Sequence, residues 1–493
     1  MKYIKYFDSV ADMTAAIANS TIGFLGMAMN NGEPVINNHK VIPPETIPFY
    51  IDVRGTVTLS ATSGLQMSTD KTNWTDTTAT TLSSGKTYFR VATDQPTPLK
   101  PNWTEDENSD YDIGGNINSL VKVNFENDTN CYTFSTYFTN KSKLKSASDL
   151  LLPATTLVNY CYQMMFAGCT GLISAPALPA TTLANYCYIH MFASCTSLTT
   201  APELPATTLA TGCYQVMFTG CTGLISAPAL PATTVAERCY DNMFVDCTSL
   251  TTAPTTLPAT TLANYCYNNM FTGCTSLTTA PTTLPATTLA QYCYQQMFKG
   301  CTSLTTAPAL PATTLANNCY KGMFSGCTSL TTAPTTLPAT TLTESCYTSM
   351  FYNCRALTTA PTILPATTLT QYCYQKMFYG CTALTTAPAT LPATTLTMGC
   401  YYQMFYGCTG LTTAPALPAT TLAQSCYYQM FQGCTNLNYI KCLATDISAT
   451  SCTTNWVNSV AASGTFVKNP NMSSWTTGNN GIPTNWTVQD ATV

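Results

Sequence analysis

Cysteine is the residue whose chemistry the sequence raises first, because 25 cysteines occur in 493 residues. Twenty-two of them form eleven pairs, and in each pair the second cysteine follows the first by eight residues. The first cysteines, 26 or 27 residues apart, are Cys161, Cys187, Cys213, Cys239, Cys266, Cys293, Cys319, Cys346, Cys373, Cys400 and Cys426. Such regular spacing could serve disulfides, metal ligation or a repeated core position.

The spacing within a pair favours a buried core position. Two residues eight apart on a straight helix lie about 12 Å apart, whereas a disulfide needs Cα atoms within about 7 Å. Zinc ligands normally come in pairs two to four residues apart, and cysteine is among the most often buried residue types. We therefore predict a ladder of buried, reduced thiols, with disulfides between neighbouring units or a metal site as the alternatives.

No arrangement of side chains suited to catalysis is found. His39 and His190 are isolated, so neither has the partners that a triad or a metal site requires, and both are predicted to be surface residues. Paired-carboxylate hydrolysis needs two acidic groups across a cleft. The acidic residues of the repeats recur at no fixed position: Glu203, Glu237, Asp241, Asp246 and Glu344. We expect no enzyme, and no catalytic residue, metal or cofactor.

The charge pattern excludes two classes of partner. Charged residues make up 9% of the chain, the net charge is -4, and an ordinary domain has about 25% charged residues. No basic stripe could displace counterions from nucleic acid, and no run of about 18 apolar residues could span a bilayer. Asp8 and Asp12 interrupt the apolar stretch that a signal peptide needs. We therefore expect folding in a cytoplasm that keeps thiols reduced.

The cysteines belong to a repeat unit, LPATTLAxYCYxxMFxGCTSLTTAPx, that recurs from about residue 152 to 440. At 100° per residue, its recurrent apolar positions fit an arc of about 140°, which predicts a short buried helix. These positions are Cys161, Tyr162, Met165, Phe166 and Cys169 in the first clear unit. The intervening residues should face solvent: Gln163, Met164 and Ala167 there, and Asp241, Asn242 and Val245 in another unit.

The rest of each unit predicts short strands and turns, because prolines exclude a helix there. Leu172, Leu198 and Leu224 should form a buried ladder, with exposed threonines beside it. One helix and one strand cannot bury their own apolar faces, so the units must stack into a solenoid. Eleven units with parallel strands about 4.8 Å apart give a rod roughly 50 Å long.

The unit resembles the BspA-type leucine-rich repeat, whose pattern is matched by Leu172, Pro179, Met191, Phe192, Cys195 and Leu198. The resemblance implies an α/β solenoid with about eleven units of 26–27 residues, right-handed and preceded here by a small β-sandwich. It also implies surface adhesins of gut and oral anaerobes, or proteins of their phages. Membership of this family implies binding and not catalysis.

The flanking segments complete the predicted organisation. Tyr137 and Phe138 mark a degenerate unit before the repeats, and Cys452 and Trp456 mark another after them. Residues 8–18 predict a helix, residues 20–29 a strand, and Trp475 and Trp486 lie in two further predicted strands. The predicted divisions are an N-terminal attachment segment (1–45), a small β-sandwich (46–112), a capping repeat (113–152), the solenoid (153–440) and a C-terminal cap (441–493).

This layout resembles fibre and other structural proteins of tailed phages that infect Bacteroidales, including crAss-like phages. The strings STDKTNWTD and GNINSL carry the resemblance together with the order of the segments. It implies a virion location, docking to other virion proteins through the N-terminal region, and contact with a host surface glycan or protein. A homotrimer is implied by analogy only. The alternative is a bacterial cell-surface adhesin.

Tyrosine provides the candidate contact surface. The tyrosine after each first cysteine should be core, but five others take variable, outward positions towards the C-terminal end. They are Tyr352, Tyr379, Tyr402, Tyr406 and Tyr428. Exposed aromatic rings beside threonine hydroxyls would suit a glycan or protein partner. The alternative is that they are scattered surface tyrosines without a role.

Overall fold

The computed structural model describes residues 47–107, 109–473 and 475–492, together with the backbone of β1 (Ile4–Phe7), β2 (Leu25–Asn30) and β3 (Glu33–Asn37). β2 pairs in parallel with β1 and antiparallel with β3. β2 covers the second half of the strand predicted over 20–29. The helix predicted over 8–18 and His39 lie outside the described residues.

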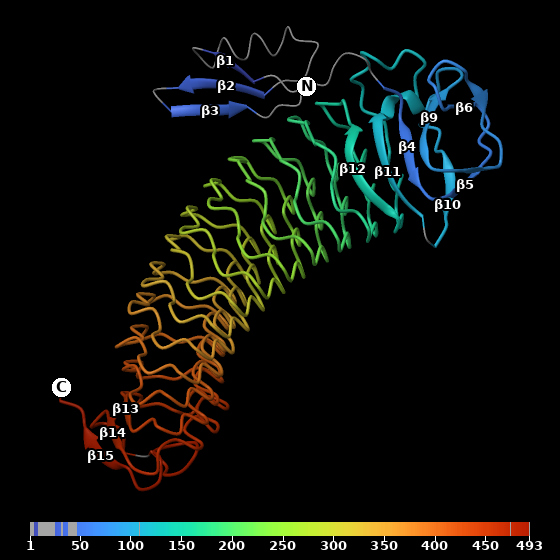
Figure 1. The fold of residues 1–493 in the computed structure, drawn as a ribbon. Coiled ribbons are helices and arrows are strands. Elements are labelled where there is room, and N and C mark those ends of the chain that lie inside the picture. Colours follow the sequence, from blue (N-terminus) through green and yellow to red (C-terminus); the bar gives the residue numbers. More distant parts are fainter. Residues whose placement is uncertain are drawn as a thin grey trace. The chain divides into compact units, whose positions relative to one another are not determined.

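The chain divides into two compact units (Figure 1). The first comprises Met1–Asn130 and Asp149–Pro153, and the second comprises Cys131–Ser148 and Ala154–Val493. The domain boundaries drawn from the sequence stay predictions.

The first unit contains the strands that alternation predicted over 46–112. In β5, Val57 and Leu59 are buried while Thr58 and Ser60 are exposed, which is the period-two pattern of a half-buried strand. Trp103 and Tyr111 pack edge to face in its core, 5.7 Å between ring centroids. One sheet has the order β10-β5-β8 and the other the order β12-β11-β4-β9-β6-β7. The strands are β4 (Tyr50–Arg54), β5 (Val57–Ser60), β6 (Leu65–Ser68), β7 (Thr75–Asp76), β8 (Thr80–Leu82), β9 (Gly85–Val91), β10 (Asn102–Glu105) and β11 (Asp110–Asn116), and β12 (Leu144–Leu151), of which only Asp149–Leu151 belongs to the first unit.

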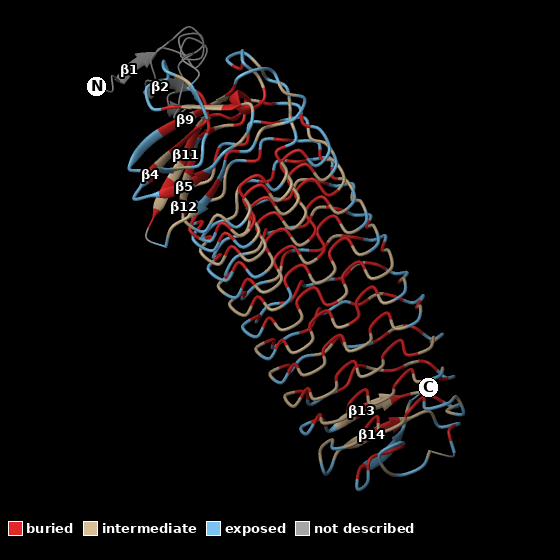
Figure 2. Ribbon diagram, turned by 90° about the vertical axis from the view of Figure 1, so that its right-hand side faces the viewer, coloured by how far each residue is buried: buried red, intermediate tan, exposed pale blue. Residues whose placement is uncertain are grey.

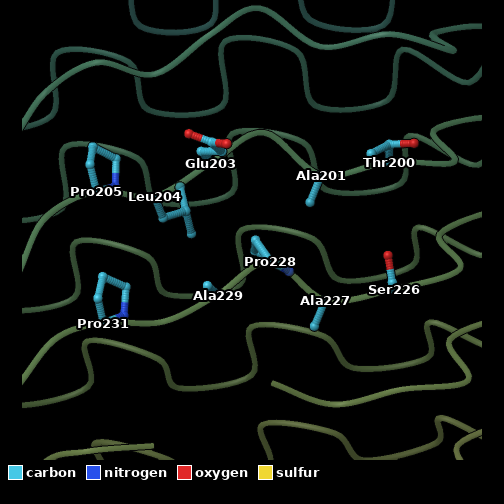
Figure 3. A pocket seen from close by; sticks show the side chains of 10 residues that line it. All are labelled: Thr200, Ala201, Glu203, Leu204, Pro205, Ser226, Ala227, Pro228, Ala229 and Pro231. Atoms are coloured by element: carbon cyan, nitrogen blue, oxygen red, sulfur yellow. The ribbon is translucent and has the colours of Figure 1, made fainter. Parts of the chain in front are cut away.

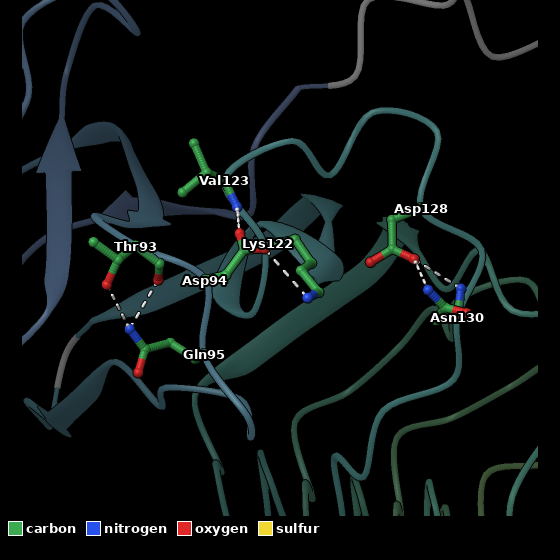
Figure 4. A network of polar contacts seen from close by, with 7 residues as sticks. All are labelled: Thr93, Asp94, Gln95, Lys122, Val123, Asp128 and Asn130. Carbon is green, nitrogen blue, oxygen red and sulfur yellow. Dashed lines mark hydrogen bonds and ion pairs between the residues drawn. The ribbon is translucent and has the colours of Figure 1, made fainter.

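Polar contacts fix the loops of the first unit (Figure 4). Asp94, after β9, accepts hydrogen bonds from the backbone N–H of Val123 at 2.9 Å and from Lys122 Nζ at 3.3 Å. These bonds lower the pKa of Asp94, the Val123 N–H contributing most. They join the loop after β9 to the segment that follows the short 3-10 helix η1 (Ile117–Leu120).

The second unit is a stack of similar rungs, each formed by one repeat, with the buried positions running through the interior (Figure 2). The helix predicted in each repeat is wrong. Residues 160–168 and their equivalents, here called the turn segments, are consecutive turns, and no α-helix occurs among the described residues.

Backbone hydrogen bonds in a turn segment alternate between two kinds of partner. The N–H of Met165 bonds to the carbonyl of Tyr162 three residues back, at 3.3 Å, within its own rung. The next N–H, that of Phe166, bonds to the carbonyl of Met191 in the following rung, at 2.9 Å. The same alternation runs along each turn segment. Neighbouring rungs therefore supply the bonds that a helix would have made internally.

The backbone of a turn segment has a four-residue period. Tyr160, Met164 and Gly168 all have positive φ angles, of 60°, 52° and 73°. Each such residue reverses the turn, so two side chains point inward and the next two outward. The buried pairs Cys161–Tyr162 and Met165–Phe166 follow this period.

Two of the six residues predicted to face solvent are buried. Ala167 is 6% exposed and Asp241 is 2% exposed. The prediction was wrong for them because rungs stack so closely that outward side chains lie against the equivalent side chains of the neighbouring rungs.

The predicted leucine ladder is confirmed, since Leu172, Leu198 and Leu224 are fully buried, and the threonines beside it are exposed. In place of the predicted strands, the structure has single-residue parallel bridges, such as Ser174 to Thr200 and Thr208 to Thr234. The prolines limit them, since proline has no N–H to donate to a longer ladder.

Aromatic residues cover the last complete rung. The ring of Trp456 lies 6.0 Å from Tyr427 and 5.7 Å from Trp475 between centroids, and its Nε1 donates to the carbonyl of Gly481 at 2.9 Å. Trp475 lies outside any strand, so the strand predicted around it is wrong, whereas a strand begins directly after Trp486. The parallel strands here are β13 (Tyr439–Cys442), β14 (Thr465–Lys468) and β15 (Thr487–Asp490).

Candidate binding surface

The cysteines serve as buried core residues. All 25 are free thiols and 24 are buried. In each of the eleven pairs, the second thiol donates to the carbonyl of a phenylalanine (Phe138 or its repeat equivalent) in the preceding rung, at 3.0–3.1 Å. Burial raises the pKa of ten of these thiols, those from Cys195 to Cys434, to about 12 for Cys327. They are protonated donors at neutral pH and belong to the structure of the rung.

Cys131 differs from the other cysteines because it is half-buried and lies before the first complete rung. A hydrogen bond with the thiol of Cys161 lowers the pKa of Cys131 and raises that of Cys161. Cys131 is therefore the thiol that ionises most readily among those whose pKa shifts.

The five predicted surface tyrosines occupy outward positions and are half-buried. Tyr352, Tyr379 and Tyr406 form one column, with centroids 4.8 and 4.5 Å apart and rings within 13° of parallel. Tyr402 and Tyr428 form a second stacked pair at 4.7 Å and 6°. The structure thus gathers the five residues into two neighbouring columns, four residues apart along the turn segment.

A sixth tyrosine, Tyr372, lies near Tyr402 of the second column and was missed in the sequence. A Cβ atom on Gly399 in the next rung would lie 2.5 Å from Cε1 of Tyr372, so the ring covers that glycine. Partial burial and the neighbouring phenols Tyr428 and Tyr372 raise the pKa of Tyr402. The sequence did offer a signal for Tyr372: the same repeat position holds tyrosine in one unit and glycine in the next. We call these six residues the tyrosine patch: Tyr352, Tyr372, Tyr379, Tyr402, Tyr406 and Tyr428.

The turn segments that carry the tyrosine patch are almost uncharged. Their four stretches, 345–353, 372–380, 399–407 and 425–433, contain a single charged residue, Lys376. The amides of Gln403 and Gln429 bond to each other between the two tyrosine columns. The patch therefore offers phenol hydroxyls, ring edges and amides, with hardly any charge.

An earlier part of the same face is built differently. Tyr265 and Tyr292 also stack, at 4.6 Å and 5°, but the guanidinium of Arg238 lies 4.2 Å from the Tyr265 ring centroid. Arg238 also pairs with the buried carboxylate of Asp241 at 3.3 Å. Stacking of outward tyrosines thus recurs along the repeats. Tyr160 and Tyr186 stack as well, at 5.2 Å and 10°, in turn segments without Asp, Glu, Lys or Arg, so what is particular to the tyrosine patch is the number of tyrosines gathered on consecutive rungs.

A groove of about 410 Å³ lies between two successive loops on another side of the rungs (Figure 3). No backbone hydrogen bond joins residues 201–205 to 227–231, whereas the later loops are joined, as by the N–H of Leu284 and the carbonyl of Ala309. Glu203 is its only charged side chain, so it has no pair of carboxylates. The lining residues are Thr200, Ala201, Glu203, Leu204, Pro205, Ser226, Ala227, Pro228, Ala229 and Pro231.

His190 is half-buried on the turn segment of its rung, and burial lowers its pKa. In the described part of the chain, no three His, Cys, Asp or Glu side chains gather closely enough to hold a metal ion. No helix among the described residues has the length and apolar character needed to cross a bilayer.

The same residue types recur at the interior positions of successive rungs, whereas the outward side chains vary. The chain is therefore a repeat scaffold that differs from rung to rung mainly at its surface. The family model for the BspA type leucine rich repeat region matches six copies, over residues 180–305, 237–385 and 349–454. These matches span more than half of the chain, and the chain belongs to the BspA-type leucine-rich repeat family.

Two solved structures resemble the chain at low identity. A leucine-rich repeat protein from Bacteroides ovatus ATCC 8483 is 16% identical over 73% of this chain and 86% of its own, with a TM-score of 0.37. A leucine rich cell surface protein from Faecalibacterium prausnitzii A2-165 is 15% identical over 78% of this chain and 94% of its own, with a TM-score of 0.31. No curated protein sequence is similar enough to match this chain.

Proposed function

We propose that the chain is a non-enzymatic binding protein whose solenoid contacts a bacterial surface through the tyrosine patch. The observation that carries this proposal is the gathering of six outward tyrosines on four consecutive rungs. Stacking fixes their rings before any partner arrives, so binding costs little side-chain entropy. Tyrosine is also enriched among the residues that dominate binding energy at interfaces.

The proposed carrier of the tyrosine patch is a phage virion. The protein is a fibre or appendage component of that virion and docks to the particle through residues 1–45. The layout of leader, β-strand region, linker and repeats supports this placement. The alternative carrier is the surface of a bacterial cell, where the protein would act as a BspA-like adhesin. Membership of the BspA-type family is compatible with both carriers.

An antibody against residues 153–440 distinguishes the two carriers. Immunogold labelling of purified particles and of the cells that produce them should place the signal on the particles. Signal on cell envelopes with none on particles would contradict the virion placement and favour the adhesin.

Binding through the tyrosine patch is tested with the purified full chain on intact Bacteroidales cells. The double variant Tyr379→Ala/Tyr402→Ala should lose most of the cell-bound protein, because it interrupts both columns. The matched control, Tyr265→Ala/Tyr292→Ala, removes two stacked outward tyrosines elsewhere and should bind like the unmodified chain. Equal loss in both variants would show that the patch has no special part in binding.

A further inference from the structure

The stacking of the tyrosine patch limits which parts of each ring a ligand can reach. Both faces of Tyr379 are covered, by Tyr352 at 4.8 Å and by Tyr406 at 4.5 Å. At Tyr379 a ligand therefore meets the phenol hydroxyl and the ring edge, and it cannot insert between the stacked rings. A hydrogen bond between Tyr379 and Tyr406 is among the causes that raise the pKa of Tyr379, so these hydroxyls lie side by side.

The charge of the surroundings restricts the ligand further. An anionic polymer needs clustered lysine or arginine, and the four turn segments of the patch contain Lys376 alone. A partner with a charged surface would lose hydration there without gaining a counter-charge. The surface thus complements a ligand that is uncharged and rich in hydrogen-bonding groups.

The third restriction comes from repetition. The patch presents the same phenol groups on successive rungs at a ring spacing of 4.5–4.8 Å, and the amides of Gln403 and Gln429 repeat between the columns. A polymer of identical units can make one contact several times along such a row. Repeated weak contacts add up to useful avidity without any deep pocket.

From these three restrictions, we propose that the tyrosine patch binds a neutral, hydroxyl-rich polysaccharide whose chain lies along the two tyrosine columns. The sugar hydroxyls exchange hydrogen bonds with the phenols and with the amides of Gln403 and Gln429, and the sugar C–H groups pack on the ring edges. The proposal rests on the proposed function and adds the chemical class of the ligand.

The test is affinity electrophoresis of the full chain through gels that contain one polysaccharide each. Four neutral polymers (an α-glucan, a β-glucan, a mannan and a galactan) are compared with the acidic polymer polygalacturonate. At least one neutral polymer should retard the chain and polygalacturonate should not. Retardation by polygalacturonate alone, or by none of the five, would overturn the proposal.

Variants test whether retardation in the gel depends on the tyrosine patch. Tyr379→Ala/Tyr402→Ala should weaken binding about tenfold or more, since two contacts of about one hydrogen bond each are lost. Tyr379→Phe/Tyr402→Phe keeps the stacked rings but removes two hydroxyls, and it should also weaken binding. The control Tyr265→Ala/Tyr292→Ala should match the unmodified chain. Full binding by the phenylalanine variant would show that the hydroxyls do not contact the ligand.

Treated cells separate a failure of this proposal from a failure of the proposed function. Periodate destroys vicinal diols of sugars, and protease removes exposed protein. Cell binding should be sensitive to periodate and resistant to protease. If binding needs the tyrosine patch but is lost with protease and kept after periodate, the surface-binding function stands and the polysaccharide proposal fails.

Discussion

The thiol of Cys195 donates a hydrogen bond to the backbone carbonyl oxygen of Phe166 in the preceding rung, with 3.1 Å between Sγ and O. The same carbonyl accepts the N–H of Cys169 within its own rung at 3.0 Å. The second cysteine of each repeat thus uses the remaining lone pair of a buried carbonyl. This explains why the position takes cysteine and not alanine, which would fill less space and donate nothing.

This bond predicts that the two cysteines of a repeat respond differently to serine. Cys327→Ser keeps a donor within reach of the Phe298 carbonyl, and we expect a loss of unfolding free energy below about 1 kcal/mol. No acceptor for the Cys319 thiol is found among the described residues, so Cys319→Ser buries a hydroxyl donor without an acceptor and should cost about 1–3 kcal/mol. Denaturant unfolding of both variants checks the difference; equal losses would contradict the assigned bond.

Cys131 should be the first thiol to react in the folded protein. It is half-buried and its pKa is lowered, whereas the other 24 cysteines are buried. Because the thiolate is the reactive form, brief treatment with iodoacetamide at pH 8 should label Cys131 and leave the repeat cysteines unmodified. Peptide mass spectrometry locates the label, and a sample unfolded in guanidinium provides the control in which all positions react. Early labelling of the repeat cysteines would show that the rungs open on this timescale.

The inward and outward positions could be read from the sequence, but the path of the backbone could not. Cys161, Tyr162, Met165, Phe166 and Cys169 are buried as predicted. Their spacing fits a helix face and also fits a chain that reverses every fourth residue. What distinguishes the two is a positive φ at Tyr160 and Met164, which is imposed by hydrogen bonds to the next rung and not by the residue types.

The candidate site was predictable in position and not in arrangement. The five tyrosines were chosen because they occupy variable, outward positions, which the repeat alignment reveals directly. Their stacking depends on the distance between rungs. The place of Tyr372 depends on the absent side chain at Gly399. Contacts between neighbouring rungs can be predicted only when the equivalent residues of successive repeats are placed next to one another.

Backbone strain at one outward position predicts a stabilising substitution. Val216 has a φ of 59°, which a β-branched residue adopts at a cost of roughly 1–2 kcal/mol. At the same repeat position Asn242 and Asn269 have φ angles of 57° and 52°, and asparagine tolerates this region. Val216→Asn should therefore raise the free energy of unfolding by about 1 kcal/mol. Val245→Asn, an outward valine without positive φ, is the control and should not stabilise the protein in denaturant unfolding.

The buried thiols predict a loss of stability in alkali. Burial raises the pKa of Cys221 and Cys274 from 9.0 to about 12, so the folded chain keeps protons that the unfolded chain releases above pH 9. The thiols should contribute no change in the free energy of unfolding between pH 7 and about pH 9. The free energy of unfolding should then fall by about 1.4 kcal/mol per pH unit for each such thiol, up to about pH 12. Urea midpoints measured from pH 7 to 11 check the onset and the steepness. A midpoint that does not change up to pH 11 would mean that the thiols do not stay protonated in the folded solenoid.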